Sequence, residues 1–369
     1  MSLDGRRISI IGAGVAGLAA ATALARRGGD VVVYERASAL RAEGAGIQIS
    51  PNGAAVLSAL DAQPRALETR AIALRDHRAG AGVLRLELAR RRWRHPFLLM
   101  HRGDLIDGLG QAAQAAGARF EFGVTADPAA LEAELVVMAG GVHAATARQF
   151  NHDLPAASFT GQVAWRAVLP EGDAAPEAHV FMGPGRHLVS YPLPGGWRNI
   201  VAVEERAAWA AEGWDHPDEP DNLRAAFADF SPQIRAWLDA VEEVKLWGLF
   251  RHPVPTRWHD GRSVVIGDAA HPTLPFMAQG ANLALEDAWV LADCLQRHDV
   301  PVALAAFQDK RRARVCRAIT AANANARNYH LRRPALRLAA HTALRLGGAI
   351  APGAALRRFD WLYGHDVTR

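Results

Sequence analysis

Two segments that lie far apart in the chain each combine an acidic side chain with glycines at the expected start of a helix. The first contains G-x-G-x-x-G at residues 12–17 and is followed by Glu35; the second, "GDAAHPTLPFMAQGANLALEDA" at 267–288, contains Asp268 and Gly280. Backbone N–H groups at a helix start bind anionic groups, and a carboxylate at a strand end accepts hydrogen bonds from sugar hydroxyls. Both segments therefore predict contact with a ligand that carries phosphate and sugar groups.

The elements around the first segment are those of a dinucleotide-binding unit. Residues 8–11 predict a short apolar strand, an alanine-rich helix extends to about Arg27, and residues 31–34 predict a second strand that leads to Glu35. In such a unit one glycine makes the tight turn, one admits a pyrophosphate, and one lets helix and strand pack closely. The glycines concerned are Gly12, Gly14 and Gly17. This unit alone does not distinguish NAD from FAD.

The second segment favours FAD. Residues 262–266 predict a buried strand that ends just before Asp268, and apolar residues recur at helical spacing after Gly280. The start of that helix is directed at whatever Asp268 binds, and its partial positive charge suits a group that becomes negative, such as a reduced flavin ring. One elongated cofactor that touches both segments accounts for both.

The composition indicates a folded protein without a nucleic-acid partner. The chain has 369 residues, 50% of them hydrophobic and 22% charged, and a formal net charge of only +4. Cys294 and Cys316 are too few for a disulfide framework and lack the spacing of metal ligands. Residues 6–25 imitate a signal peptide, but no apolar stretch reaches the roughly twenty residues of a membrane span. We expect a cytoplasmic protein with no metal ion and no stable membrane insertion.

Motifs distributed over nearly the whole chain resemble one known family. They are the N-terminal fingerprint with Glu35 and Arg36, "GAGIQISPNG" at 44–53, "HRGDLIDGL" at 101–109, "VAWRAVLP" at 163–170, "HLVSYPLPGGWRNIVAVEE" at 187–205, the 267–288 segment and "WLYGHD" at 361–366. These motifs resemble those of the single-component flavoprotein aromatic hydroxylases, or class A FAD monooxygenases. Within that family the sequence is most similar to the hydroxylases of salicylate, 3-hydroxybenzoate and 6-hydroxynicotinate.

The resemblance implies FAD as cofactor and NADH or NADPH as reductant. It also implies that a flavin C4a-hydroperoxide, formed with O2, hydroxylates a small aromatic substrate, either a phenolic or an N-heteroaromatic acid. We expect a monomer or homodimer. The cofactor-binding residues that the resemblance implies are Gly12, Gly14, Ala16, Gly17, Glu35, Arg36, Gly46, Arg102, Val124, Asp268, Pro275, Gly280, Ala281 and Asn282.

His187 and Tyr191 are the candidate catalytic residues. In an extended strand His187, Val189 and Tyr191 share one face, because side chains alternate along a strand. The resemblance implies that this imidazole and this phenol hold and deprotonate a ring hydroxyl, which makes the ring a better nucleophile toward a peroxide. The alternative is a structural histidine at a sheet edge and a tyrosine packed under the turn that follows.

Further residues are candidates for contact with the substrate. Arg166 could anchor a substrate carboxylate, as could Arg186 and Arg198, although each of these arginines could equally be a solvated side chain. The apolar candidates Trp165, Phe276 and Met277 could instead be ordinary core residues. The expected substrate-binding residues are Gln48, Trp165, Arg166, Phe276 and Met277.

The expected fold is mixed α/β, with a Rossmann-like FAD-binding domain, an inserted antiparallel-sheet substrate domain and a C-terminal helical tail. The predicted FAD-binding domain is discontinuous, and the alternating strands between its parts would lie over the flavin. The predicted boundaries are 1–70, 95–150 and 255–300 for the FAD-binding domain, 71–94 and 151–254 for the substrate domain, and 301–369 for the helical region.

The sequence departs from the family pattern at three kinds of position. Gly140 stands where relatives carry an aspartate associated with binding of FAD and NAD(P)H, and Ala144 stands where a serine is usual. The stretch 124–134 is shorter than the usual hairpin, and Phe276 replaces a residue that is often polar. Three alternatives stay open: an epoxidase or other FAD oxidoreductase of this fold, a flavin-binding protein without turnover, and an NAD-dependent dehydrogenase that uses the first segment alone.

Overall fold

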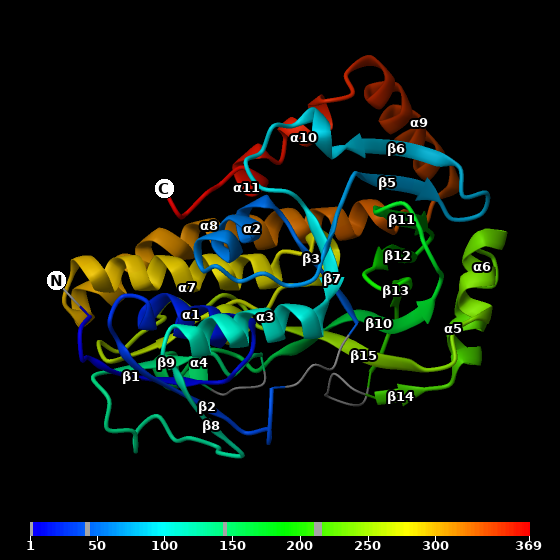
Figure 1. Cartoon of the computed structure of the whole chain (residues 1–369). Coiled ribbons are helices and arrows are strands. Elements are labelled where there is room, and N and C mark those ends of the chain that lie inside the picture. The colour runs from blue at the N-terminus through cyan, green and yellow to red at the C-terminus, as the bar shows by residue number, and fades with distance from the viewer. Residues whose placement is uncertain (1–2, 41–44, 143–145, 210–215) are drawn as a thin grey trace.

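The structure is a computed structural model that describes residues 3–40, 45–142, 146–209 and 216–369. A five-stranded sheet with its helices occupies one side of the molecule, and an eight-stranded sheet lies beside it (Figure 1). The predicted fold class, mixed α/β with a Rossmann-like unit, a second sheet and C-terminal helices, is confirmed.

The five-stranded sheet is parallel and has the strand before the glycine segment at its centre. Its strands in spatial order are β16 (Ser263–Val265), β9 (Leu135–Met138), β1 (Arg7–Ile11), β2 (Asp30–Glu35) and β8 (Arg119–Phe122). Helix α1 (Val15–Ala25) is buried along most of its length, because its small side chains let it pack between α3 (Arg102–Ala115) and α7 (Gly280–Arg297). The carboxyl ends of parallel strands share one edge, so the loops after β1, β9 and β16 meet there.

The eight-stranded sheet is antiparallel except at one pair. Its strands in order are β14 (His216–Asp218), β15 (Val244–Arg251), β10 (Ser158–Pro170), β13 (Trp197–Glu205), β12 (Arg186–Leu193), β11 (Glu177–Gly183), β5 (Ala71–Asp76) and β6 (Gly82–Glu87). The prediction of an antiparallel sheet is wrong for β5 and β11, which pair in parallel. After β6 the chain leaves this sheet and returns at β10, so no hairpin fixes the relative direction of β5 and β11.

The two faces of this sheet contact different parts of the molecule. One face, through Trp165 and Leu188, packs against α5 (Pro220–Ala226) and α6 (Pro232–Asp239). The opposite face, which we call the inner face, packs through Ala164 and Val203 against the short helix η3 (Pro275–Met277). That helix precedes α7, so the inner face lies toward the loops of the five-stranded sheet.

A small sheet of β3 (Gly46–Ile49), β7 (Leu98–His101) and β4 (Leu67–Glu68) connects the two larger sheets. The Gly46 N–H donates to Asn199 Oδ1 at 2.7 Å, and a Cβ at Gly46 would lie 2.7 Å from the Tyr191 ring. Only glycine therefore lets β3 lie this close to the inner face.

A buried charge cluster joins α7 to the long helix α8 (Val300–Tyr329). Arg311 of α8 contacts Glu286 at 2.5 Å and Asp287 at 2.7 Å, and all three side chains are at most 1% exposed. Asp287 also contacts His271 at 2.5 Å. These partners satisfy charges that would be costly to bury alone, and they fix the loop before η3 relative to both helices.

The remaining elements complete the described chain. They are α2 (Pro51–Ala59), α4 (Thr146–Phe150), α9 (Pro334–Ile350), α10 (Ala354–Arg357) and α11 (Asp360–Tyr363), with 3₁₀ turns η1 (Leu88–Arg90) and η2 (Gly267–Ala269). The C-terminal helices include α9, which packs against β6 (Figure 1). Within the four described ranges, no helix is both long enough and apolar enough to cross a membrane.

Candidate active site

The glycine segment has the backbone geometry of a dinucleotide-binding turn. Gly12 has φ +104°, and a Cβ there would lie 2.6 Å from the Ala139 carbonyl oxygen, so this turn requires glycine. A Cβ on Gly17 would lie 1.9 Å from the Gly12 carbonyl oxygen. A Cβ on Gly14 would meet no described atom within 4 Å, so the segment has one open side at the start of α1. A pyrophosphate fits this open side, where the N–H groups of α1 are directed.

Glu35 holds the glycine turn in place. Its carboxylate accepts hydrogen bonds from the backbone N–H of Ala13 at 2.8 Å and of Ala37 at 2.9 Å. The N–H of Val124 donates to the Glu35 carbonyl at 3.0 Å, and both Arg36 and Val124 are exposed beside it. The Glu35 carboxylate thus has a structural role of its own. Contacts of Glu35, Arg36 and Val124 with a cofactor stay predictions.

The loop after β16 packs directly against the first glycine segment. A Cβ on Gly267 would lie 2.8 Å from the Ala16 Cβ, and the Gly267 N–H donates to Asp287 at 3.0 Å. The Ala16 side chain therefore packs against this loop, and contact of Ala16 with a cofactor stays a prediction. Asp268, which follows Gly267, is exposed. Desolvation by the surrounding protein nevertheless raises the pKa of its carboxyl, while His271 and Arg102 act to lower that pKa.

The start of α7 faces the Asp268 carboxylate. A Cβ on Gly280 would lie 3.7 Å from Asp268 Oδ1. The first backbone bond of the helix runs from Leu283 N–H to Gln279 O, and no side chain caps the helix, so the N–H groups of Gly280, Ala281 and Asn282 have no intrahelical partner. The Asn282 side chain accepts from Ser50 N–H at 2.9 Å and donates to Ala278 O at 2.6 Å, so it has a structural role.

These observations fit FAD. Two uncapped helix starts, the open side of Gly14 and the exposed Asp268 carboxylate lie along one edge of the parallel sheet. Arg102, at the start of α3, is exposed and close enough to Asp268 and Arg166 to influence the pKa of both. Pro275 is half-buried in η3 beside the same edge. The residues that would hold the cofactor are thus brought together from three distant parts of the sequence.

Arg166 projects from the inner face without a carboxylate partner. Its guanidinium stacks on the Trp247 ring at 4.5 Å, and Nε is buried without a hydrogen bond to any described residue. Desolvation lowers the pKa of Arg166 to about 10, with Tyr191 opposing and Arg102 adding to the shift. A buried cation without a partner is costly, so binding of an anionic group next to it is strongly favourable.

The other two candidate anchors have partners already. Arg198 forms an ion pair with Glu171 at 2.5 Å and donates to Ser190 Oγ at 2.8 Å. Arg186 contacts Asp229 at 3.3 Å and lies over the Phe227 ring on the helix-covered side. Of the three arginines, the geometry favours only Arg166 as an anchor for a substrate.

Arg166, His187 and Tyr191 surround a small apolar surface on the inner face. In the sheet register Arg166 is opposite Val201, and Val201 is opposite Val189, so these residues form one row across three strands. His187 and Tyr191 flank this row: along β12, His187 lies two residues before Val189 and Tyr191 lies two residues after it. Across the sheet, Arg166 lies two strand spacings, about 10 Å, from Val189.

Tyr191 is placed between the small sheet and the inner face. It is 3% exposed, and burial raises the pKa of its phenol, opposed first by Arg166 and then by hydrogen bonding with Gln48 and Asn199. Gln48 of β3 is half-buried next to it. The phenol is thus kept protonated, as a hydrogen-bonding group and not as a base at neutral pH.

His187 is almost fully buried in an aromatic environment. Its ring lies 5.5 Å from Phe276 and 5.4 Å from Tyr329, and its Nδ1 is 2.6 Å from His330 Nε2. Burial holds the pKa of His187 well below its usual range, with His330 adding to the effect. The imidazole is therefore neutral at neutral pH, and one of its two ring nitrogens keeps a free lone pair.

Two of the predicted substrate contacts do not lie on the inner face. Trp165 lies on the face covered by α5, where its Nε1 donates to Asp218 at 2.6 Å and its ring packs 6.0 Å from Phe227. Met277 belongs to the core of the five-stranded sheet. Phe276 does belong to the inner face, where it packs beside Val201 and Trp247.

Sequence reasoning did not find several residues that the structure brings into the site. Trp247 supports Arg166, Asn199 binds Gly46, and Glu205 and His330 continue the hydrogen bonds of His187. Asn199 and Glu205 share the alternation of β13 with Val201, which is the signal that could have identified them. Gly140 lies beside Gly12 at the end of β9, and Ala144 lies outside the described residues.

The fold and these loops define a Rossmann-type FAD-binding protein with a second sheet over its cofactor edge. Residues 84–322 match the family model described as FAD binding domain, and residues 10–68 match that of the NAD(P)-binding Rossmann-like domain. Over 391 aligned residues, covering 98% of this chain and 96% of the relative, the sequence is 34% identical to 3-amino-4-hydroxybenzoate 2-monooxygenase PtnB3 of Streptomyces platensis.

A second relative and a solved structure are also similar to this chain. The chain is 32% identical to 3-hydroxybenzoate 6-hydroxylase of Polaromonas naphthalenivorans, covering 98% of this chain and 96% of that protein. Klebsiella pneumoniae HpxO complexed with FAD and uric acid shares the fold, with a TM-score of 0.82, 24% identity, and coverage of 94% of this chain and 95% of that one. The chain belongs to the FAD-dependent aromatic hydroxylases, and it is an FAD-dependent monooxygenase that uses NAD(P)H. The predicted family, enzyme class and cofactors are confirmed.

Proposed function

We propose that this monooxygenase hydroxylates a small aromatic acid that carries a ring hydroxyl, bound on the inner face with its carboxylate at Arg166. The observation that carries this proposal is the Arg166 guanidinium, which is stacked on Trp247 and has no acidic partner among the described residues. An aromatic ring over Val201 would place a ring hydroxyl within the area bounded by His187 and Tyr191. The named substrates of the relatives, 3-amino-4-hydroxybenzoate and 3-hydroxybenzoate, have both groups.

The side chains of the inner face have distinct roles in this proposal. Bound FAD supplies the chemistry of oxygen transfer after reduction by NAD(P)H. Arg166 binds and orients the carboxylate, since guanidinium and carboxylate match in geometry. His187 removes the proton of the ring hydroxyl, and the protonated Tyr191 phenol donates a hydrogen bond to the substrate. Phe276, Val201 and Val189 exclude water from this surface.

The division of the chain follows from the same assignment. We propose that residues 1–70, 95–150 and 255–300 bind FAD and that 71–94 and 151–254 bind the substrate, which is supported by the separate sheets that these segments form. We also propose a cytoplasmic enzyme that acts as a monomer or homodimer. The free thiols of Cys294 and Cys316 and the use of NAD(P)H support the location. Light scattering of the purified protein measures the oligomeric state.

Anaerobic stopped-flow absorbance tests the proposed function. The purified flavoprotein is mixed with NADH or NADPH in the presence of 3-amino-4-hydroxybenzoate, 3-hydroxybenzoate or 6-hydroxynicotinate, and benzoate serves as a ligand without the hydroxyl. We expect ligand-stimulated loss of the oxidised flavin band, and a hydroxylated product after oxygen is admitted. Reduction at equal rates with every ligand and with none, without product, would contradict the proposal.

A further inference from the structure

Three side chains form a continuous chain of hydrogen bonds that leads away from the inner face. His187 Nδ1 is 2.6 Å from His330 Nε2, and His330 Nδ1 is 2.9 Å from Glu205 Oε1. His187 and His330 are 1% and 4% exposed, whereas the Glu205 side chain is 30% exposed. The chain of contacts therefore begins at a buried base and ends at a carboxylate that reaches solvent.

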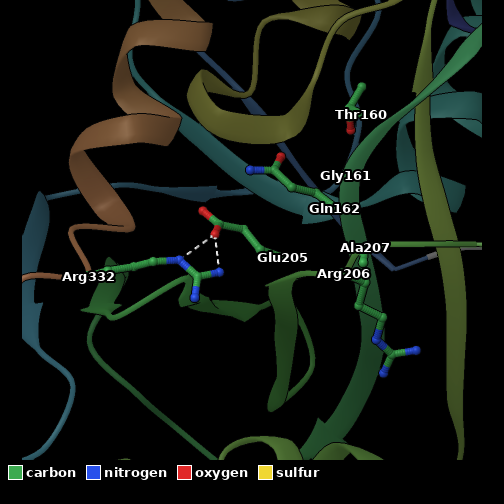
Figure 2. A pocket seen from close by; sticks show the side chains of 7 residues that line it. All are labelled: Thr160, Gly161, Gln162, Glu205, Arg206, Ala207 and Arg332. Atoms are coloured by element: carbon green, nitrogen blue, oxygen red, sulfur yellow. Dashed lines mark hydrogen bonds and ion pairs between the residues drawn. The ribbon is translucent and has the colours of Figure 1, made fainter.

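The outer end of this chain opens into a surface pocket. Glu205 and Arg332 line a pocket of about 400 Å³ together with Gln162 and neighbouring residues. Figure 2 shows the Glu205 carboxylate and the Arg332 guanidinium directed at one another, and their ion pair measures 2.5 Å. None of these pocket residues belongs to the candidate cofactor or substrate contacts. The pocket thus gives Glu205 access to water on the far side of the histidines.

Few other ionisable groups face these three hydrogen-bonded side chains. Phe276 and Tyr329 flank the His187 ring, and burial raises the pKa of Tyr329 to about 12, so that phenol stays protonated. Arg332 is the only cation paired with Glu205 in the described part of the chain. Across the described ranges, no three His, Cys, Asp or Glu side chains are arranged to hold a metal ion.

The contacts define one arrangement of protons. Arg332 and His330 keep the pKa of Glu205 low against its partial burial, so Glu205 is an acceptor and His330 Nδ1 carries the hydrogen. His330 Nε2 then accepts, and His187 Nδ1 must donate to it. His187 Nε2 is left without a hydrogen, and it is the only ring nitrogen of the pair free to accept one from a ligand.

We propose that His330 and Glu205 form a proton relay that orients His187 as the base for the substrate hydroxyl and carries the removed proton to the pocket at Arg332. This inference rests on the proposed function. The substrate O–H bond breaks and its proton bonds to His187 Nε2. The Nδ1 proton of His187 passes to His330 Nε2, the Nδ1 proton of His330 passes to Glu205, and Glu205 releases it to water. Each group loses one proton and gains one, and no oxidant is required.

Proton release on substrate binding tests the relay directly. The oxidised holoenzyme is mixed with 3-amino-4-hydroxybenzoate or 3-hydroxybenzoate in weak buffer that contains a pH-indicator dye. For the wild type we expect fast proton release at the rate at which the phenolate spectrum of the ligand appears. In Glu205→Gln and His330→Gln we expect release at least about tenfold slower, with FAD content and ligand affinity unchanged.

The choice of variants separates a relay from a purely structural role. A glutamine at 330 retains one donor and one acceptor for Glu205 and His187 but cannot pass a proton through itself. Glu204→Gln is the matched control, because Glu204 precedes Glu205 in β13, points to the other face and pairs with Arg206 at 2.9 Å. We expect wild-type release from this control.

The possible outcomes distinguish the two proposals. Wild-type rates of proton release in both glutamine variants would overturn the relay and leave the hydroxylase intact. Product formation by the wild type without proton release would also overturn the relay alone. If the wild type neither releases a proton nor forms product with any ligand of the panel, the proposed function itself fails.

Discussion

At the scale of single residues, the role that we propose for Arg166 is to bind the carboxylate of the substrate. We expect Arg166→Met to raise the Kd of 3-hydroxybenzoate by about 10- to 100-fold, because one charge-assisted interaction in a desolvated site is lost. Phenol, which lacks the carboxylate, should bind equally to both proteins. Ligand-induced changes in the flavin spectrum measure both constants.

Arg206 provides the control for this substitution. It belongs to the helix-covered side of the large sheet, where it lies 4.8 Å over the Trp165 ring and pairs with Glu204. Arg206→Met should leave the Kd of 3-hydroxybenzoate unchanged. An equal loss for phenol and 3-hydroxybenzoate in Arg166→Met would show that this arginine supports the fold and does not bind the carboxylate.

The adjacent residues Trp165 and Arg166 show how far the sequence can predict a site. Strand alternation places neighbours on opposite faces, so Trp165 and Arg166 cannot both contact a ligand on one face, and Trp165 lies on the helix-covered face. The pattern "VAWRAV" does not reveal which face meets the flavin, because both faces of this strand are buried against other elements. Alternation did correctly place His187, Val189 and Tyr191 together.

At the scale of elements, Asp287 holds the loop that follows β16. It accepts from the Gly267 N–H at 3.0 Å, contacts His271 at 2.5 Å and binds Arg311 at 2.7 Å. We expect Asp287→Asn to lower the free energy of unfolding by about 3–5 kcal/mol, since Arg311 and Glu286 lose charge balance in a buried site. Urea denaturation of the holoenzyme measures this change, and FAD retention on dilution should fall with it.

Asp293 on the same helix is the comparison for Asp287. Its side chain is 25% exposed and pairs with Arg297 one turn away. Asp293→Asn should change the free energy of unfolding by less than about 0.5 kcal/mol. Similar losses in both variants would mean that the cluster around Asp287 has no special role.

Elements that depend on local sequence were predicted well. The strand, glycine turn and helix at 7–25 agree with the expectation because turn, helix and strand signals are adjacent in the sequence. The expected helix after Gly280 is α7, and the expected strand at 262–266 is β16, shorter at both ends. The charge cluster was not predicted, because Asp287 meets Arg311 only when α7 and α8 pack together.

At the scale of the whole molecule, the lowered pKa of the half-buried His179 makes stability depend on pH. Burial, with Arg75 and Arg198 nearby, lowers the pKa of His179 to about 4, and Arg75 donates to its Nδ1 at 2.9 Å. In the unfolded chain a histidine has a pKa of about 6.5. The unfolded state therefore binds the extra proton first, so this stabilisation is complete above pH 6.5 and is lost as pH falls toward 4.

Urea denaturation at several pH values measures this effect. We expect the midpoint to fall between pH 7 and pH 5, and the slope to be smaller in His179→Gln. The stabilisation that comes from the lowered pKa values of Glu286 and Asp287 is fully present from pH 7 to pH 5, and it is lost only as the pH falls below the carboxyl pKa of the unfolded chain. A midpoint that is constant from pH 7 to pH 5 would rule out His179 as a contributor.

Long-range contacts also determine when the site is assembled. His187 meets His330 across 143 positions of sequence, and the five-stranded sheet that begins with β1 is completed only by β16. A ribosome releases the chain from its N-terminus, so the glycine turn emerges long before the residues that complete the base. A nascent chain therefore carries the fingerprint of a flavoenzyme well before it has both of the histidines that we propose for deprotonation of a phenol.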